Sequence, residues 1–246
     1  MSTTLSLSML LLPISWAVSA ERVIDVHNDA GLRRALSDAA TGTTIRVAPG
    51  SYSPGIFIQD LRGTADQPIV IEGADPDRPP EFRGGGTAWQ FSNCAYLTLR
   101  NLAVRGQSGN GINIAFVGVD GATVRYNTIY RPDRWVIRIL QETTAPGFPP
   151  CRDGRFEHNL VVFRAADLAT VVNIGPNTDP ASFRFTNNLW FCEDRPQSSR
   201  PQLPVPETSS LYGIDPQLEA PDRRRFRPLN PQAQPFGAHA MPDGNP

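Results

Sequence analysis

The chain contains no lysine, because all 23 of its basic residues are arginine. This absence excludes any reaction that needs a lysine amine as its base or nucleophile. Histidine is also scarce: His27, His158 and His239 lie in distant segments, so the sequence offers no histidine cluster for a metal ion. The 23 basic and 24 acidic residues give a formal net charge of −1. We therefore expect no nucleic-acid partner.

Cysteine is nearly absent as well, since the chain has only Cys94, Cys151 and Cys192. They do not form the CxxC or CxxH spacing of a metal site. Cys94 falls inside a strand repeat, where we expect a buried, small apolar side chain. Cys151 and Cys192 flank polar turns in consecutive repeats, and we predict a disulfide between them. Closing that loop of 41 residues (192 − 151 = 41) would stabilise the fold by about 4 kcal/mol in the chain-entropy model.

The apolar run at the N-terminus, Leu5 to Val18, is short of the ~20 residues that a membrane-spanning helix needs. Small residues at Val18-Ser19-Ala20 stand where a secretory peptidase cuts, although residues 1–4 include no Lys or Arg. We predict that residues 1–20 are a signal peptide, with an uncleaved anchor as the alternative. We expect the mature protein to be a monomer that is secreted, periplasmic or part of the cell envelope, without membrane contact.

A repeat occupies the middle of the chain, from Thr87 to Arg138. Each copy has a strand, a polar kink with Asn and a second strand: Trp89-Gln90-Phe91 then Leu97 to Val104, and Ile112-Asn113-Ile114 then Thr123 to Ile129. The asparagine after the second strand recurs at intervals of 26, 32 and 29 residues (127 − 101, 159 − 127, 188 − 159), as Asn101, Asn127, Asn159 and Asn188. A solenoid places one residue of each coil over the same residue of the next. The interval therefore predicts an asparagine ladder, with each hydrogen bond contributing about 1 kcal/mol.

The segments around this repeat predict an all-β protein with one helix. Residues 29–40 form an amphipathic pattern that Asp29 can cap, and the later segments are short strands separated by turn residues. Residues 194–208 are rich in Pro and Ser. We therefore divide the chain into the signal peptide 1–20, a coiled domain 21–193 and a Pro-rich extended segment 194–246 that packs on it and ends in disorder.

Two features resemble the right-handed parallel β-helix proteins of the pectin-lyase-like superfamily: the segment Gly42 to Tyr52 (Gly-Thr-Thr-Ile-Arg-Val-Ala-Pro-Gly-Ser-Tyr) and the asparagine-phased coils. The tail, Tyr212 to Leu218 followed by Phe226 to Leu229, is similar to the end of many secreted bacterial β-helix proteins. The resemblance implies a single-stranded right-handed parallel β-helix of about six coils with a short N-terminal capping helix. It does not imply one activity, because the superfamily includes lyases, hydrolases, epimerases and proteins with no known reaction.

In such a solenoid we expect the ligand on the outward residues of one sheet. With Trp89, Phe91, Ile112, Ile114, Ile137, Ile139, Val172 and Ile174 pointing inward, the period of two turns the following residues outward: Gln90, Asn113, Arg138 and Asn173. We predict that Gln90, Asn113, Asn173, Arg131 and Arg164 bind substrate. A cationic row of this kind suits acidic polysaccharide, because arginine binds a carboxylate through two parallel hydrogen bonds.

The first functional hypothesis is β-elimination on a polyuronate. By resemblance to pectate lyases, Arg138 or Arg134 is the base, and Asp133 and Glu142 are calcium ligands. The alginate lyase and chondroitinase B branch is more similar at the N-terminus, but its mechanism needs a lysine. Hydrolysis is disfavoured, because Asn177-Thr178-Asp179 matches one polygalacturonase motif while the others are missing. The alternative is a non-catalytic glycan-binding or cell-envelope structural protein, which single, unclustered carboxylates favour.

Overall fold

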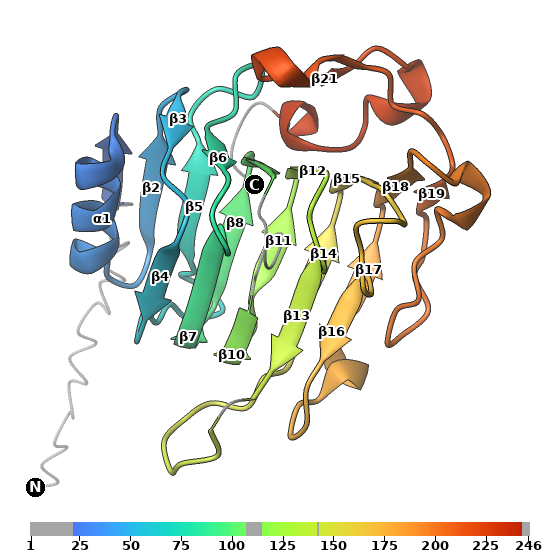
Figure 1. The fold of residues 1–246 in the computed structure, drawn as a ribbon. Helices are drawn as coiled ribbons and strands as arrows, with labels where there is room; N and C mark the ends of the chain where they lie inside the picture. Colours follow the sequence, from blue (N-terminus) through green and yellow to red (C-terminus); the bar gives the residue numbers. More distant parts are fainter. Residues whose placement is uncertain (1–21, 107–114, 142, 243–246) are drawn as a thin grey trace, which may run out of the picture.

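The computed structural model describes residues 22–106, 115–141 and 143–242. Over these ranges the chain forms a right-handed parallel β-helix, which confirms the predicted fold class. It visits three parallel sheets in turn, so that the strands of these sheets pair with the equivalent strands of the next coil (Figure 1). We number these sheets 1, 2 and 3 in the order in which one coil passes through them. The predicted signal peptide lies outside the described residues.

The described strands group by sheet. Sheet 1 contains β4 (Ile56–Gln59), β7 (Trp89–Ala95), β10 (Ala115–Asp120), β13 (Ile137–Leu140) and β16 (Val172–Ile174). Sheet 2 contains β1 (Arg22–Val26), β2 (Thr43–Val47), β5 (Ile69–Gly73), β8 (Leu97–Arg100), β11 (Thr123–Arg125), β14 (Arg155–Glu157) and β17 (Arg184–Thr186). Sheet 3 contains β3 (Ser51–Tyr52), β6 (Glu81–Arg83), β9 (Ala103–Arg105), β12 (Thr128–Tyr130), β15 (Leu160–Phe163), β18 (Leu189–Cys192) and β19 (Leu211–Tyr212).

The core fills the inside of the coils because alternate residues of each strand point inward. On sheet 2 one inward row is continuous across neighbouring strands and buried throughout: Ile45, Ile71, Leu99, Val124, Phe156 and Phe185. On sheet 1, Trp89 and Phe91 are 0% and 1% exposed. Ile174 differs, since it is in register with the buried Ile139 yet 42% exposed. It lies on β16, where sheet 1 ends within the described chain and no further coil covers it.

One helix, α1 (Asp29–Asp38), lies at the end of the stack beside β2 (Figure 1). Leu32 is fully buried, so the helix covers the open end of the core as predicted. Its cap is Asn28, whose side chain accepts a hydrogen bond from the Gly31 N–H at 2.8 Å. Asp29, the expected cap, instead accepts hydrogen bonds from the backbone N–H and the hydroxyl of Ser53.

A ladder of buried asparagines runs along the corner between sheets 2 and 3. The N–H of Asn127 donates to Oδ1 of Asn159 at 3.0 Å, and the N–H of Asn159 donates to Oδ1 of Asn188 at 2.9 Å. The rung before Asn127 is Leu102, whose N–H donates to Oδ1 of Asn127. At the other end the Asn188 N–H donates to the hydroxyl of Ser210.

Asn101 therefore lies one position earlier than the other three asparagines. It is in register with Tyr126, His158 and Asn187, which share a left-handed backbone conformation with φ of 52–55°. Asparagine tolerates that conformation better than most residues. The Asn101 side chain donates to the Gly73 carbonyl at 2.7 Å. The spacing of the asparagines in the sequence therefore combined two adjacent corner positions, the ladder position and the left-handed position before it.

The C-terminal part of the chain covers the outer face of sheet 3 (Figure 1). It contains an antiparallel pair, β20 (Leu218–Ala220) and β21 (Arg225–Pro228), and short 3₁₀ turns at Pro196–Ser198, Pro221–Arg223, Pro231–Ala233 and Ala238–Ala240, while a further 3₁₀ turn, Pro180–Ser182, lies between β16 and β17. Phe226 and Phe236 pack with Tyr130 and Leu160 in a second apolar cluster. Because β19 still pairs with β18, the coils continue beyond residue 193.

The structure does not form the predicted Cys151–Cys192 disulfide. Both thiols are free and buried, as is that of Cys94. Cys151 lies in the turn that leads from sheet 1 to sheet 2, whereas Cys192 ends β18 on sheet 3. The two cysteines therefore occupy different corners of the coil.

Candidate functional site

The outward face of sheet 1 carries one row of residues in register across five strands. Its members are Phe57, Gln90, Ala115, Arg138 and Asn173, and we call this set the sheet 1 row. Gln90, Arg138 and Asn173 stand here as the sequence predicts. The position between Gln90 and Arg138 belongs to Ala115, while the predicted Asn113 lies outside the described residues.

Arg138 is fixed from two sides. Its Nε donates to Oδ1 of Asn173 at 3.3 Å, and its guanidinium carbon lies 4.6 Å from the centroid of the Trp135 ring. The guanidinium of Arg134 lies 4.5 Å from the same centroid. Cation–π attraction of this kind contributes roughly 0.5–1 kcal/mol per pair at exposed sites. The half-buried Trp135 ring thus holds two positive charges beside the sheet 1 row.

The other predicted residues do not gather at this point. Arg131 forms an ion pair with Glu193 at 2.6 Å, and that hydrogen bond raises the pKa of Arg131. Arg164 lies 4.0 Å from Asp167. Asp133 is half-buried in the turn before Trp135, and the predicted second calcium ligand, Glu142, lies outside the described residues. In the described part of the chain, no three His, Cys, Asp or Glu side chains come together as a metal site.

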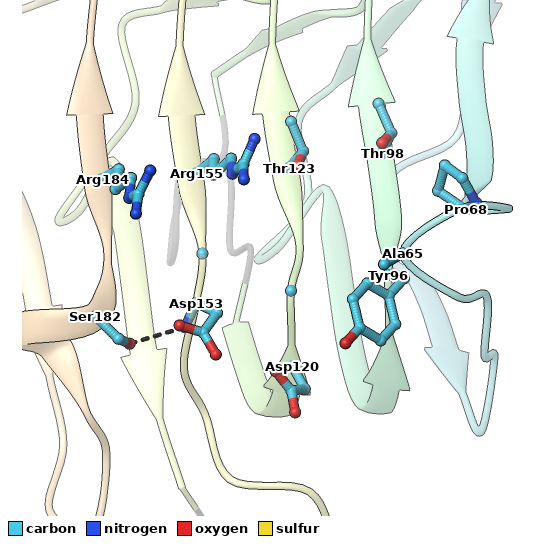
Figure 2. Close-up of a pocket in the computed structure, with 12 residues that line it drawn as sticks. Ala65, Pro68, Tyr96, Thr98, Asp120, Thr123, Asp153, Arg155, Ser182 and Arg184 are labelled. Carbon is cyan, nitrogen blue, oxygen red and sulfur yellow. Dashed lines mark hydrogen bonds between the residues drawn. The ribbon is translucent and has the colours of Figure 1, made fainter.

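A pocket of about 360 Å³ lies on the outer face of sheet 2, and we call it the sheet 2 pocket (Figure 2). Its upper row consists of Thr98, Thr123, Arg155 and Arg184, which are in register on four neighbouring strands. Figure 2 shows Tyr96, Asp120, Asp153 and Ser182 below this row, at the turn that enters sheet 2 from sheet 1. The backbone of Gly121 permits this turn: its φ is +70°, and a Cβ there would lie 2.9 Å from the Tyr96 ring.

Charges around the sheet 2 pocket are unevenly paired. Asp120 accepts two hydrogen bonds from Arg152, at 2.8 and 3.1 Å. Arg155 and Arg184 are exposed, and neither guanidinium has an ion-pair or hydrogen-bond partner within the described ranges. The pocket therefore presents two adjacent positive charges on one side. This pocket was not predicted from the sequence. The signal for it is that Thr123, Arg155 and Arg184 each stand four residues before a ladder asparagine.

A second outward row on sheet 2 is charged on six neighbouring strands, from β1 to β14, as Asp25, Arg46, Glu72, Arg100, Arg125 and Glu157, and ends at Thr186 on β17. The Arg100–Glu72 ion pair at 2.6 Å is buried, with the two side chains 8% and 10% exposed. Burial lowers the pKa of Arg125, and the positive charge of Arg100 lowers it further. At the adjacent corner the rings of Tyr126 and His158 stack at 4.7 Å, and burial lowers the pKa of His158.

No family model matches the chain, and no curated protein matches it. A solved structure does: the alginate lyase from Paenibacillus sp. str. FPU-7 is 17% identical with a TM-score of 0.51, over 69% of this chain and 66% of that one. The likeness is one of fold. Two further structures align at lower TM-scores: the PL6 family alginate lyase AlyGC (13% identity, TM-score 0.46) and the PL6 family polysaccharide lyase Pedsa3628 from Pseudopedobacter saltans (17%, 0.46).

Each of these two alignments covers 68% of this chain, but only 28% of AlyGC and 46% of Pedsa3628. The chain thus spans between about a quarter and two thirds of the length of the structures it matches. None of the helices in its described part has the length and apolar character that crossing a bilayer requires.

Proposed function

We propose that this is a secreted protein of the pectin-lyase-like superfamily that binds acidic polysaccharide along the sheet 1 row. The observation that carries the proposal is the position of Arg138, held between the Trp135 ring and Asn173 on the outward face of the sheet. A guanidinium whose orientation is already fixed loses little conformational freedom when it binds a carboxylate. Arg134 adds a second charge on the same ring.

The rest of the sheet 1 row supports a polymer rather than a small ligand. Five strands at roughly 4.8 Å spacing give a row of about 19 Å, which is several sugar residues long. Phe57, at the end opposite Asn173, is 55% exposed and offers an apolar surface for the C–H face of a sugar ring. Gln90 supplies amide groups for sugar hydroxyls between the two ends.

Cleavage by β-elimination is the second candidate function. In that reaction a base removes the C5 proton beside the uronate carboxylate, the C4–O bond breaks, a C4=C5 double bond forms and the leaving oxygen takes a proton. Arg134 favours this candidate, because it is exposed and has no ion-pair partner within the described ranges. The likeness in fold to an alginate lyase adds to it. Calcium would act on the substrate carboxylate, and Asp133 is the described residue proposed to bind it.

The test compares the wild-type protein with Arg138→Ala on pectate, alginate and glycosaminoglycans. We expect binding to weaken about 10-fold or more, the loss typical of one hydrogen-bonded charge pair. Arg33→Ala on α1 removes the same charge outside the sheet 1 row and is the control. Equal affinity of Arg138→Ala and the wild type would refute the proposed surface. Cleavage is measured by the ultraviolet absorbance of unsaturated uronide, with calcium or a chelator present. Absorbance that appears with the wild type and is lost in Arg134→Ala would establish the lyase. No absorbance on any of these polysaccharides, with binding retained, would show that the protein binds its ligand without cleaving it.

A further inference from the structure

We propose that the sheet 2 pocket is a second carbohydrate-binding site, in which Arg155 and Arg184 bind the carboxylate of an acidic sugar residue. The site lies on a different sheet from the sheet 1 row and shares no residue with it. This proposal is therefore independent of the function proposed above.

The two arginines form an anion site by their register. Arg155 on β14 is directly opposite Arg184 on β17, on strands that lie roughly 4.8 Å apart. Figure 2 shows both side chains on the same outward side of the sheet. Like charges placed opposite each other on neighbouring strands repel, and no described residue neutralises this pair. A carboxylate between the two guanidiniums would remove the repulsion and accept hydrogen bonds from both.

The remainder of the sheet 2 pocket presents hydroxyl groups and two carboxylates, those of Asp120 and Asp153. Thr123 continues the arginine row, and the phenol of Tyr96 stands at the rim. Asp153 is 60% exposed, and its backbone N–H donates to the hydroxyl of Ser182 at 2.8 Å. Groups of this kind bind sugar hydroxyls. A ligand that matches the pocket has its acid at the arginine end and its hydroxyls at the Asp153 end, as a uronate does and an inorganic anion does not.

Size and charge also fit one or two acidic sugar residues. The volume of about 360 Å³ falls within the range of roughly 300–1,000 Å³ that is common for small-molecule sites. The carboxylate of Asp120 would repel such a ligand, but Arg152 pairs with it. The negative charge that remains, on Asp153, lies 3.5 Å from the same Arg152. The arginine end of the pocket thus keeps its positive charge.

Amide NMR of the labelled protein, titrated with trigalacturonate, tests the site. We expect the signals of Gly121 and Gly154, which line the sheet 2 pocket, to shift with one common dissociation constant. In Arg155→Gln/Arg184→Gln that constant should rise about 10-fold or more. The control Arg33→Gln/Arg34→Gln removes two exposed charges from α1 and should leave it unchanged. A dissociation constant in Arg155→Gln/Arg184→Gln that equals that of the wild type, or no shift of the two glycine signals in the wild type, would overturn the proposal.

Two further arms identify the ligand. Neutral maltotriose should not shift the glycine signals, because the arginine pair selects for charge, and saturation by maltotriose would contradict that selection. A sulfated oligosaccharide should bind more weakly than trigalacturonate, and stronger binding would overturn the assignment to a carboxylate. Arg138→Ala should leave the pocket signals unchanged, so failure of the sheet 1 row and failure of the sheet 2 pocket give different results.

The unliganded protein supplies a measurement that does not depend on the choice of sugar. Arg184→Thr removes one of the two opposed charges and matches Thr123 on the same row. Because the repulsion is then absent, the midpoint of thermal unfolding should rise by about 1 °C. A fall in the midpoint would show that the Arg184 guanidinium stabilises the fold and would contradict the role as a binding group.

Discussion

Replacing Asn159 with alanine removes the centre of the asparagine ladder. The side chain is fully buried, and its Oδ1 accepts from the N–H and the Nδ2 of Asn127 at 3.0 and 3.2 Å. Its own Nδ2 donates to the Val124 carbonyl at 3.0 Å and to Oδ1 of Asn188 at 3.2 Å. The substitution leaves the Asn127 N–H and the Val124 carbonyl buried without these partners, at a cost of about 1–3 kcal/mol each. We expect the free energy of unfolding to fall by about 3–5 kcal/mol.

Asn187→Ala is the matched control. This residue precedes Asn188 in the adjacent coil and is half-buried, and no side-chain hydrogen bond holds it within the described ranges. Its φ of 52° makes the alanine variant lose about 1 kcal/mol through backbone conformation alone. Urea unfolding followed by circular dichroism measures both variants against the wild type. If Asn159→Ala and Asn187→Ala lose the same stability within error, the ladder does not hold the coils together and the reasoning fails.

Three further perturbations test other contacts. Glu72→Gln removes the carboxylate that pairs with the buried Arg100, so urea unfolding should show a loss of about 3 kcal/mol. A loss below 1 kcal/mol would show that the pair adds little to stability. Burial raises the pKa of Cys94 to about 11 and that of Cys151 to about 12, so both thiols stay protonated at pH 8 and the native protein should react slowly with a thiol reagent. The urea-unfolded, unreduced chain should instead show three reactive thiols. A count of one would reveal a disulfide. The hydrogen bond from the Cys192 thiol lowers the pKa of Asp194 to about 2, so the stabilisation that this carboxylate adds is present above pH 4 and is lost as the pH falls toward 2. In Asp194→Asn the free energy of unfolding should therefore depend less on pH in that window. An unchanged pH dependence would contradict this.

The features that depend on period two were predictable from the sequence, because inward and outward residues alternate along the strands except at left-handed residues such as Asn93 in β7. Ile137 and Ile139 are buried and Arg138 points outward for this reason. The fold followed from the recurrence of asparagine. Its exact phase did not, because Asn101 occupies the left-handed corner position that asparagine also favours.

The features that depend on which corner of a coil a residue occupies were not predictable. Cys151 and Cys192 both border polar turns, but a triangular coil has three turns and the sequence does not say which one. The sheet 2 pocket shows the same limit. Arg155 and Arg184 are 29 residues apart (184 − 155) and meet only because three intervening turns return the chain to the same sheet.

The two ends of the stack have a consequence for how this protein can vary in length. Helix α1 closes one end, and at the other the carboxylate of Glu207 accepts hydrogen bonds from Asn188, Trp190 and Tyr212. Between these ends each strand of the three sheets pairs with the equivalent strands of the adjacent coils, as in other repeat proteins. A whole coil inserted before Asn159 would therefore extend the surfaces of sheets 1 and 2 by one strand each, and the C-terminal cover of sheet 3, which contacts both Tyr130 and Leu160, would have to lengthen with it. Gene duplication can therefore change the length of either surface along a polymer by one whole coil at a time.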